Sequence, residues 1–234
     1  MSHAFKVATY NIRKAVGLDQ KRNPARIVSV LNEIDADIVA LQEVDRRFGA
    51  RQSAIPLAML EADTPYVPVS LNAFPAAIGW HGNAILLRKG IELRHAQPID
   101  MPTLEPRGAV MAELSAGGHD LRVIGVHLDL SGLWRRKQIR ALLAAIDASP
   151  RFMPTIMMGD FNQWSDKGAL SELAFHHHRL VQTPKSFHTS RPVACLDRII
   201  VSHDVTVTAA DCHISALSKQ ASDHLPIWAS MQIG

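Results

Sequence analysis

Short apolar runs alternate with polar segments rich in turn residues along the whole chain. Apolar runs of about 4–8 residues bounded by glycine, proline or asparagine predict buried strands. Several successive runs are separated by turns alone, which favours antiparallel pairing. Strands are expected at residues 5–10, 37–41, 66–71, 84–88, 92–99, 109–114, 121–126, 154–158, 196–201, 205–210 and 226–231.

Only a few segments have the periodicity of a helix. Asn23 followed by Pro24 is typical of a helix start, with the asparagine as N-cap and the proline in the first helical position. An apolar stripe at helical spacing follows, formed by Ile27, Val30, Leu31 and Ile34. Further helices are expected at residues 53–61, 133–148 and 167–174. With so few helices among so many strands, the sequence predicts an α+β fold with two packed, mainly antiparallel sheets and helices outside them.

Length and composition limit the possible classes of protein. The chain has 234 residues, 47% of them hydrophobic, which suits one domain over residues 1–234. The net charge of +3 permits a polyanionic partner without requiring one. Two cysteines, Cys195 and Cys212, argue against a disulfide framework. No apolar stretch reaches membrane-spanning length and no secretory leader is visible, so a cytoplasmic location is expected.

The segment Gly159-Asp160-Phe161-Asn162 is the strongest candidate for chemistry. It follows the apolar run at residues 154–158, and alternation along a strand would direct Asp160 and Asn162 the same way. A carboxylate and an amide at the end of a strand can activate water and stabilise charge. Gly-Asp-x-Asn also describes an ordinary turn, so this segment alone does not establish a site.

Polar residues also stand at the ends of other apolar runs. The candidates are Asn11, Glu43, His127, Asp197 and the Asp223-His224 pair. Each has a structural alternative as a cap, a turn or a solvated strand end. Glu43, however, follows a run of buried type, where a lone charge needs a partner such as a hard divalent cation. The run His176-His177-His178 is instead expected to be a solvated loop or helix end, because adjacent histidines share no face of a helix or strand.

Taken together and in order, these segments resemble the endonuclease/exonuclease/phosphatase family, metal-dependent phosphoesterases with a deoxyribonuclease-I-like fold. The resemblance rests on the segments at residues 9–11, 41–44, 82–86, 126–128, 159–162, 196–199 and 222–226. Each motif is weak alone, but their order and spacing extend over nearly the whole chain. The resemblance implies a four-layer α/β/β/α sandwich.

The resemblance also implies a role for each candidate. Glu43 would bind Mg²⁺ or Mn²⁺, with Asn11 beside it and Asp223 supporting the metal or the histidine. Asp160 would orient or deprotonate the attacking water, and Asn162 would donate to a phosphoryl oxygen. The remaining roles fall to His224 as phosphate contact or acid/base, Asp197 as the group that sets its tautomer, His127 as second histidine, and Arg107 and Asn83 as contacts to the substrate phosphate.

Two departures from the family pattern argue against abasic-site repair and leave the role of the second histidine open. Abasic-site endonucleases of this family carry a Tyr-x-Pro-Asn segment where this chain has His127-Leu128-Asp129-Leu130. Secreted deoxyribonucleases place a glutamate before the middle strand to pair with the second histidine, whereas residues 79–83 contain no acid. The role of His127 as a proton donor is therefore open, and so is Arg107 as a phosphate clamp or a surface turn arginine.

The function predicted from the sequence is a divalent-metal-dependent phosphoesterase, and within that class a phosphodiesterase. Nucleic acid, a phospholipid head group and a small phosphodiester remain open as substrates. One alternative is a catalytically inactive ligand-binding member of the same fold. A second is an unrelated layered protein, in which the candidate residues would scatter in space rather than meet at one site.

Overall fold

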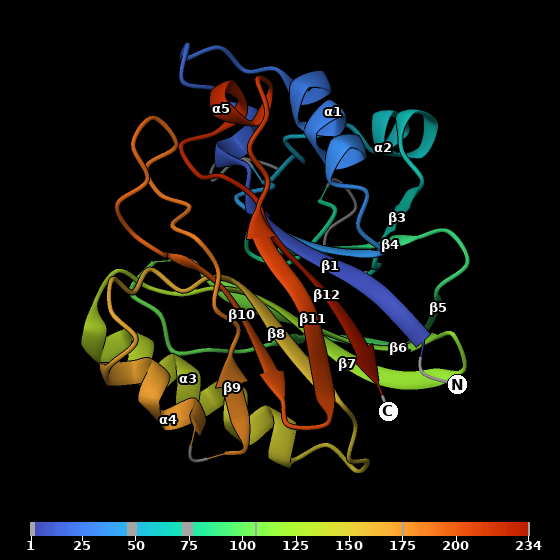
Figure 1. The fold of residues 1–234 in the computed structure, drawn as a ribbon, viewed down its shortest axis with the longest axis vertical. Coiled ribbons are helices and arrows are strands. Elements are labelled where there is room, and N and C mark those ends of the chain that lie inside the picture. The colour runs from blue at the N-terminus through green and yellow to red at the C-terminus, as the bar shows by residue number, and fades with distance from the viewer. Residues whose placement is uncertain (1–2, 46–50, 72–76, 106, 175, 234) are drawn as a thin grey trace.

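The computed structural model describes residues 3–45, 51–71, 77–105, 107–174 and 176–233. Within these residues the strands form two six-stranded sheets (Figure 1). The first sheet has the order β11 (Val205–Cys212), β12 (Ile227–Ile233), β1 (His3–Asn11), β2 (Ile38–Gln42), β4 (Ala84–Arg88), β3 (Tyr66–Pro68). The second has the order β5 (Glu92–Ile99), β6 (Gly108–Ala116), β7 (His119–His127), β8 (Thr155–Asp160), β10 (Asp197–Ser202), β9 (His178–Leu180).

Each sheet has one parallel pair at its centre, and its other described pairs are antiparallel. Strand β1 runs parallel to β2, and β7 runs parallel to β8. Parallel neighbours need a crossover connection, which contains α1 (Pro24–Ile34) in the first sheet and α3 (Gly132–Asp147) in the second. The shorter helical segments are η1 (Arg13–Ala15), α2 (Leu57–Asp63), η2 (Gly168–Leu170), α4 (Ser171–Ala174) and α5 (Ser218–Ala221).

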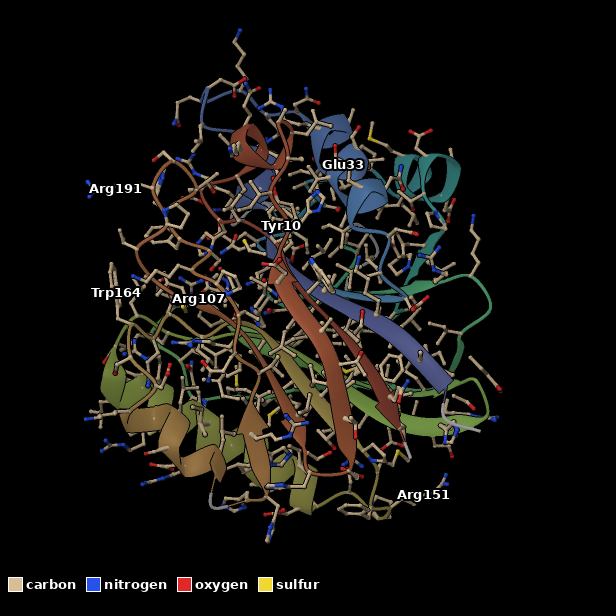
Figure 2. The ribbon with its side chains drawn as sticks, in the orientation of Figure 1. Tyr10, Glu33, Arg107, Arg151, Trp164 and Arg191 are labelled. Carbon is tan, nitrogen blue, oxygen red and sulfur yellow. The ribbon has the colours of Figure 1, made fainter. Side chains whose placement is uncertain are left out.

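Three apolar layers hold the four structural layers together. The central layer lies between the sheets and contains inward-facing side chains such as Val7, Ala40, Val123 and Met158. A second layer joins the first sheet to α1 and α2, and a third joins the second sheet to α3 and α4. In Figure 2, Tyr10 lies at the middle of the view, where it belongs to the layer beneath α1. The predicted α/β/β/α sandwich with mainly antiparallel sheets is confirmed.

The start of α1 agrees with the sequence. The side chain of Asn23 accepts a hydrogen bond from the Arg26 N–H at 3.1 Å, and Pro24 occupies the first helical position. The apolar stripe of Ile27, Val30, Leu31 and Ile34 is buried. Capping and periodicity were therefore sufficient to locate this helix.

Two local predictions were wrong. The helix expected at residues 53–61 begins only at Leu57, because Pro56 adopts an extended N-cap conformation before it. The histidine run is not entirely a solvated loop or helix end: His176 and His177 lie in an exposed turn, but His178 is buried on β9 and pairs with Ser202 of β10. The short edge strand was missed because three residues give too little periodicity. No helix among the described residues has the length and apolar character to cross a membrane.

Gly159 allows β7 and β8 to approach closely just before Asp160. Its φ of 155° lies at the edge of the region that L-residues rarely adopt. A Cβ at this position would lie 1.9 Å from the carbonyl oxygen of Val126 on β7. The parallel register that places His127 beside Asp160 therefore depends on the absence of a side chain here.

We expect Gly159→Ala to lower the free energy of unfolding by about 2–4 kcal/mol, because the methyl group must push two central strands apart. Urea denaturation measures the change. Gly90→Ala is the matched control, since Gly90 has a φ of 104° but nothing within 4 Å of an added Cβ. Equal losses in the two variants would contradict the close-approach explanation.

Candidate active site

The inward-facing positions of the central strands change from apolar to polar at one end of the sandwich. On β1, Val7 belongs to the layer between the sheets, and alternation directs Asn11 to the same face. On β8, Ile156 and Met158 belong to this layer, so Asp160 also faces inward. The two polar side chains meet across the sheets: Asn11 Nδ2 donates to Asp160 Oδ2 at 3.0 Å.

Strand register brings two more candidates beside Asp160. Asp197 is its antiparallel partner on β10, and His127 is its parallel partner on β7. His127 Nε2 lies 3.4 Å from Asp160 Oδ2. Three neighbouring strands of the second sheet therefore each contribute one candidate side chain to the same point, although the residues span positions 127 to 197 of the chain.

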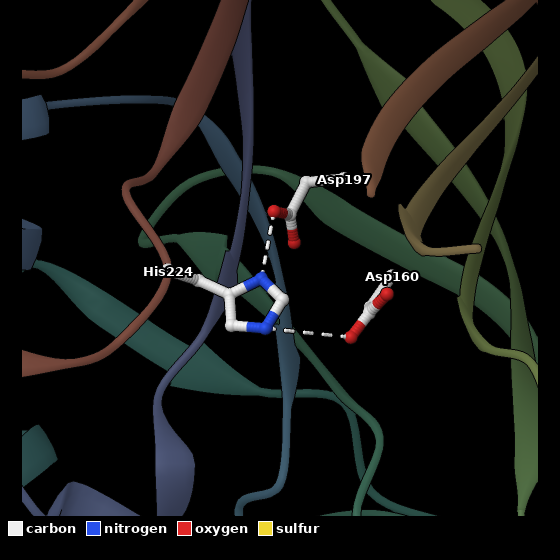
Figure 3. Close-up of side chains that lie close together, drawn as sticks. All are labelled: Asp160, Asp197 and His224. Carbon is white, nitrogen blue, oxygen red and sulfur yellow. Dashed lines mark hydrogen bonds and ion pairs between the residues drawn. The ribbon is translucent and has the colours of Figure 1, made fainter. Parts of the chain in front are cut away.

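His224 comes from the loop before β12 and completes this cluster (Figure 3). Its Nδ1 lies 2.8 Å from Asp197 Oδ2, and its Nε2 lies 3.8 Å from Asp160 Oδ2. The hydroxyl of Ser186 donates to the same Asp197 oxygen. Ligand-type atoms of Asp160, Asp197 and His224 all lie within 4.8 Å of one another, and all three residues are buried.

The pKa values of Asp160 and His224 are both raised, but for different physical reasons. Burial raises the pKa of Asp160 to about 6, against the attraction of His224 and the hydrogen bonds from Asn162 and Asn11. Burial by itself would lower the pKa of His224, but the negative charges of Asp197 and Asp160 outweigh it and raise the pKa to about 10. His224 is therefore an imidazolium at neutral pH, and Asp160 is a carboxylate with a raised affinity for protons.

Asn162 lies beyond the end of β8, where strand alternation no longer sets its direction. Its φ of 49° is left-handed. The main-chain N–H of Asn162 donates to Asp160 Oδ1 at 2.9 Å, and its side-chain Nδ2 donates to the Leu128 carbonyl at 2.8 Å. In this structure Asn162 fixes the Asp160 carboxylate and joins the loops after β7 and β8. Its role toward a phosphoryl oxygen stays a prediction.

Glu43 follows β2 directly and adjoins the cluster through Asn11. The parallel register pairs Asn11 with Gln42, so Glu43 is the next residue along. Its φ of 57° is left-handed, and its carbonyl accepts a hydrogen bond from the Lys14 N–H at 3.1 Å. The carboxylate of Glu43 forms an ion pair with the Lys14 ammonium. Glu43 is not one of the three closest acid and histidine groups, and its link to them is the pairing of β2 with β1.

Asp223 lies next to His224 and also pairs with a cation. Its Oδ2 is 3.5 Å from Arg13 Nε, and its carbonyl accepts from the Thr189 N–H at 2.8 Å. The preceding residue, Ser222, donates its hydroxyl to the Asn11 carbonyl at 2.7 Å. The loop before β12 is thus bonded to the end of β1, which brings the C-terminal part of the chain to the N-terminal strand.

Arg107 supplies the neighbour of His127 that the sequence did not reveal. Its Nη1 lies 2.8 Å from His127 Nδ1, and its Nη2 donates to Glu105 Oε2 at 3.2 Å. Arg107 is 9% exposed, so it is not a free surface arginine. The same Nη1 also contacts His127 Nε2, so Arg107 lies against both nitrogens of the ring. The His127 ring therefore lies between a cation, Arg107, and an acid, Asp160.

Asn83 is fully buried and has a structural contact. Its Nδ2 donates to the Gly108 carbonyl at 2.8 Å, joining the start of β4 to the start of β6 across the sandwich. Its Oδ1 has no hydrogen-bond partner among the described atoms. The expected contact between Asn83 and a substrate phosphate stays a prediction.

The sequence interpretation missed four residues of this region. They are Arg13, Lys14, Ser186 and Ser222. A basic pair two and three residues after the strand-end Asn11, and a serine two residues before His224, were the available signals. Neither is specific, since basic residues after a strand usually face solvent and serines are common in turns.

Comparison with known proteins places this geometry in a family. The family model for the Endonuclease/Exonuclease/phosphatase family matches residues 8–224. The chain is 27% identical over 254 residues to Uncharacterized protein YbhP of Escherichia coli K12, covering 98% of this chain and 97% of the relative.

Solved structures agree on the fold. An endonuclease/exonuclease/phosphatase from Bacteroides vulgatus superposes with a TM-score of 0.78 at 17% identity, covering 99% of this chain and 100% of that one. D. rerio TDP2, solved in complex with a single-strand DNA product, superposes with a TM-score of 0.74 at 18% identity, covering 97% of this chain and 98% of that one. Because the family model covers nearly the whole chain and includes the strand-end segments described above, this protein belongs to the endonuclease/exonuclease/phosphatase family.

Proposed function

We propose that this protein is a phosphoesterase, and specifically a phosphodiesterase, that hydrolyses a P–O bond by water attack with the help of Mg²⁺ or Mn²⁺. The observation that carries the proposal is the buried Asp160–His224–Asp197 group, which Asn11 and His127 join at one end of the sandwich. Such a cluster costs folding free energy, because two carboxylates and an imidazolium are removed from water. Residues that scattered as independent caps and turns would not produce it.

The residues present suit a hard divalent cation. Glu43, Asp223 and Asn11 offer oxygen donors next to the buried cluster, and oxygen donors are what Mg²⁺ and Mn²⁺ prefer. One oxygen of Asp197, Oδ1, is buried without a hydrogen-bond partner among the described atoms. Both Glu43 and Asp223 already pair with a cationic side chain, so this edge of the cluster attracts positive charge. A bound cation would supply the charge that offsets the negative charge developing on the phosphoryl group.

Asp160 has the properties of the group that orients and deprotonates water. Its pKa of about 6 gives it a higher proton affinity than an exposed aspartate while it remains ionised at neutral pH. Asn11 and the Asn162 N–H hold its two oxygens in place, so the carboxylate is fixed before substrate arrives. We assign to Asp160 the acceptance of the water proton as the new P–O bond forms.

His224 is suited to the phosphate rather than to the water. Its Nδ1 proton is engaged by Asp197, which leaves the proton on Nε2 to face the reacting group. An imidazolium there donates to a phosphoryl oxygen whose charge increases in the transition state. The departing oxygen then takes a proton from this side of the site or from water. His127, which Arg107 contacts, adds a second hydrogen-bonding group near Asp160.

Three classes of substrate are candidates, and an assay must distinguish them. Nucleic acid is supported by the likeness to D. rerio TDP2, solved with a DNA product. A phospholipid head group and a small phosphodiester are supported by the His127-Leu128 segment, which resembles that of sphingomyelinase-like and inositol-phosphatase-like members of the family. The alternative of a catalytically inactive ligand-binding member makes the opposite prediction for every substrate. An assay panel therefore needs single- and double-stranded DNA, RNA, sphingomyelin, inositol phosphates and bis-p-nitrophenyl phosphate.

We expect Asp160→Ala to reduce kcat by roughly a hundredfold or more on whichever substrate is hydrolysed, because the activated water loses its base. EDTA should abolish the wild-type activity, and added Mg²⁺ or Mn²⁺ should restore it. Asp63→Ala, which removes an exposed carboxylate at the end of α2, is the control and should retain full activity. Activity that survives both chelation and Asp160→Ala would overturn the mechanism.

The paired charges of His224 and Asp197 predict a pH dependence of stability. The pKa of His224 is raised from 6.5 to about 10, so its stabilising contribution is complete below about pH 6.5 and is lost as pH rises through 10. We therefore expect the difference in unfolding free energy between wild type and His224→Gln to shrink between about pH 6.5 and 10.

Urea denaturation in EDTA at about pH 6, 8 and 9.5 measures this difference. Chelation keeps cations from binding the carboxylates and obscuring the effect. The matched control is His119→Gln, because His119 lies at the start of β7, far along that strand from His127. A difference that stays constant across this range would mean that His224 is neutral in the folded protein.

A further inference from the structure

Two cationic side chains contact the carboxylates that are expected to meet the divalent ion. The Lys14 ammonium pairs with Glu43 Oε2, and Arg13 Nε lies 3.5 Å from Asp223 Oδ2. The two basic residues stand two and three positions after Asn11, following Ile12.

The backbone holds this basic pair in an unfavourable conformation. Arg13, Lys14 and Ala15 have φ values of 46°, 55° and 60°, so three consecutive residues with side chains are left-handed. L-residues avoid this region, and such conformations persist only where surrounding contacts impose them. Here the turn directs two basic side chains back toward the site.

Several hydrogen bonds impose the turn. The Lys14 N–H donates to the Glu43 carbonyl at 3.1 Å, and the Lys14 carbonyl accepts from Arg22 Nε at 3.2 Å. The Asn23 N–H donates to the Ala15 carbonyl at 2.8 Å. The main chain of Lys14 is thus attached to the same residue that its side chain neutralises, which keeps the ammonium beside Glu43 while the long stem stays movable.

Lys14 and a divalent ion would compete for one carboxylate. Two positive charges at the same oxygen repel each other, and Mg²⁺ or Mn²⁺ carries the higher charge. The ion pair is only partly buried, with the Lys14 side chain 28% exposed and that of Glu43 20% exposed, so the lysine has room to leave. An ammonium on a flexible four-carbon stem can then follow negative charge to a new position, which a planar guanidinium does less readily.

We propose that Lys14 is an exchangeable cation of this site. It neutralises Glu43 while no divalent ion is bound, leaves the carboxylate when the ion takes it, and then pairs with a charged phosphoryl oxygen of the substrate. Lys14 is therefore a substrate-binding residue whose position depends on the state of the metal site, and it selects phosphoesters that keep a negative charge. The substrate half of this inference rests on the proposed function, whereas the competition at Glu43 does not.

Metal binding tests the competition without any turnover. Isothermal titration of the metal-free protein with Mn²⁺ should show Lys14→Met binding about two- to fivefold more tightly than wild type, because a partly exposed ion pair no longer has to be broken. Glu43→Gln should weaken binding, which identifies the titrated site. Lys21→Met, an exposed lysine in the same connection, should leave the affinity unchanged. An affinity of Lys14→Met equal to or weaker than that of wild type would overturn the exchange.

Steady-state kinetics at saturating Mn²⁺ test the second position of Lys14. With bis-p-nitrophenyl phosphate, Lys14→Met should raise KM by about tenfold, as expected for loss of one charge-assisted contact, while kcat stays within about threefold. Lys14→Arg should restore part of the binding, and Lys21→Met should behave as wild type. An unchanged KM would overturn the substrate contact.

The two experiments distinguish a failure of the proposed phosphodiesterase activity from a failure of the proposed competition at Glu43. If wild type hydrolyses nothing in the panel, the proposed function fails, but the Mn²⁺ titration still decides whether Lys14 competes for Glu43. Matching circular dichroism spectra and unfolding midpoints for Lys14→Met and wild type exclude a folding defect as the cause of either result.

Discussion

The face-to-face packing of two sheets is the constraint on which the rest of this molecule depends. The inner faces of the sheets approach so closely that a Cβ on Gly125 would lie 3.3 Å from Ile85 and 3.4 Å from Ala40 of the opposite sheet. Along most of the sandwich these faces are apolar and exclude water. Where they become polar, side chains from different sheets are forced into contact, as Asn11 and Asp160 are.

Buried carboxylates at this end of the sandwich need compensating positive charge, and neighbouring residues supply it. Asp160 and Asp197 are both almost entirely buried, and two carboxylates so placed would repel each other. His224 lies between them and carries the compensating charge, which explains why its pKa rises despite burial. At the edge of the cluster, Lys14 and Arg13 perform the same task for Glu43 and Asp223. Positive charge is thus built into every part of the site that offers an acid.

Much of this arrangement was predictable from local patterns. The N-cap at Asn23, the apolar stripe of α1 and the strands β4 and β5 follow from periodicity and turn residues alone. The candidate residues Asn11, Asp160 and Asp197 could be recognised because each ends or begins an apolar run. Their convergence could be inferred only through the family resemblance. The short edge strand β9 and the delayed start of α2 were mispredicted, since a three-residue strand and a proline at a helix boundary give weak or ambiguous signals.

The sequence by itself determined the layers and the identity of the polar strand ends, because alternation of apolar residues is a local property that each segment carries alone. Only the tertiary structure decided the partners: Arg107 beside His127, Lys14 on Glu43, and Ser186 on Asp197. These pairs join residues between 11 and 29 positions apart, through loops and a left-handed turn without a distinctive pattern. Their contacts arise from strand register and from the need to compensate buried charge, and both depend on the whole folded chain.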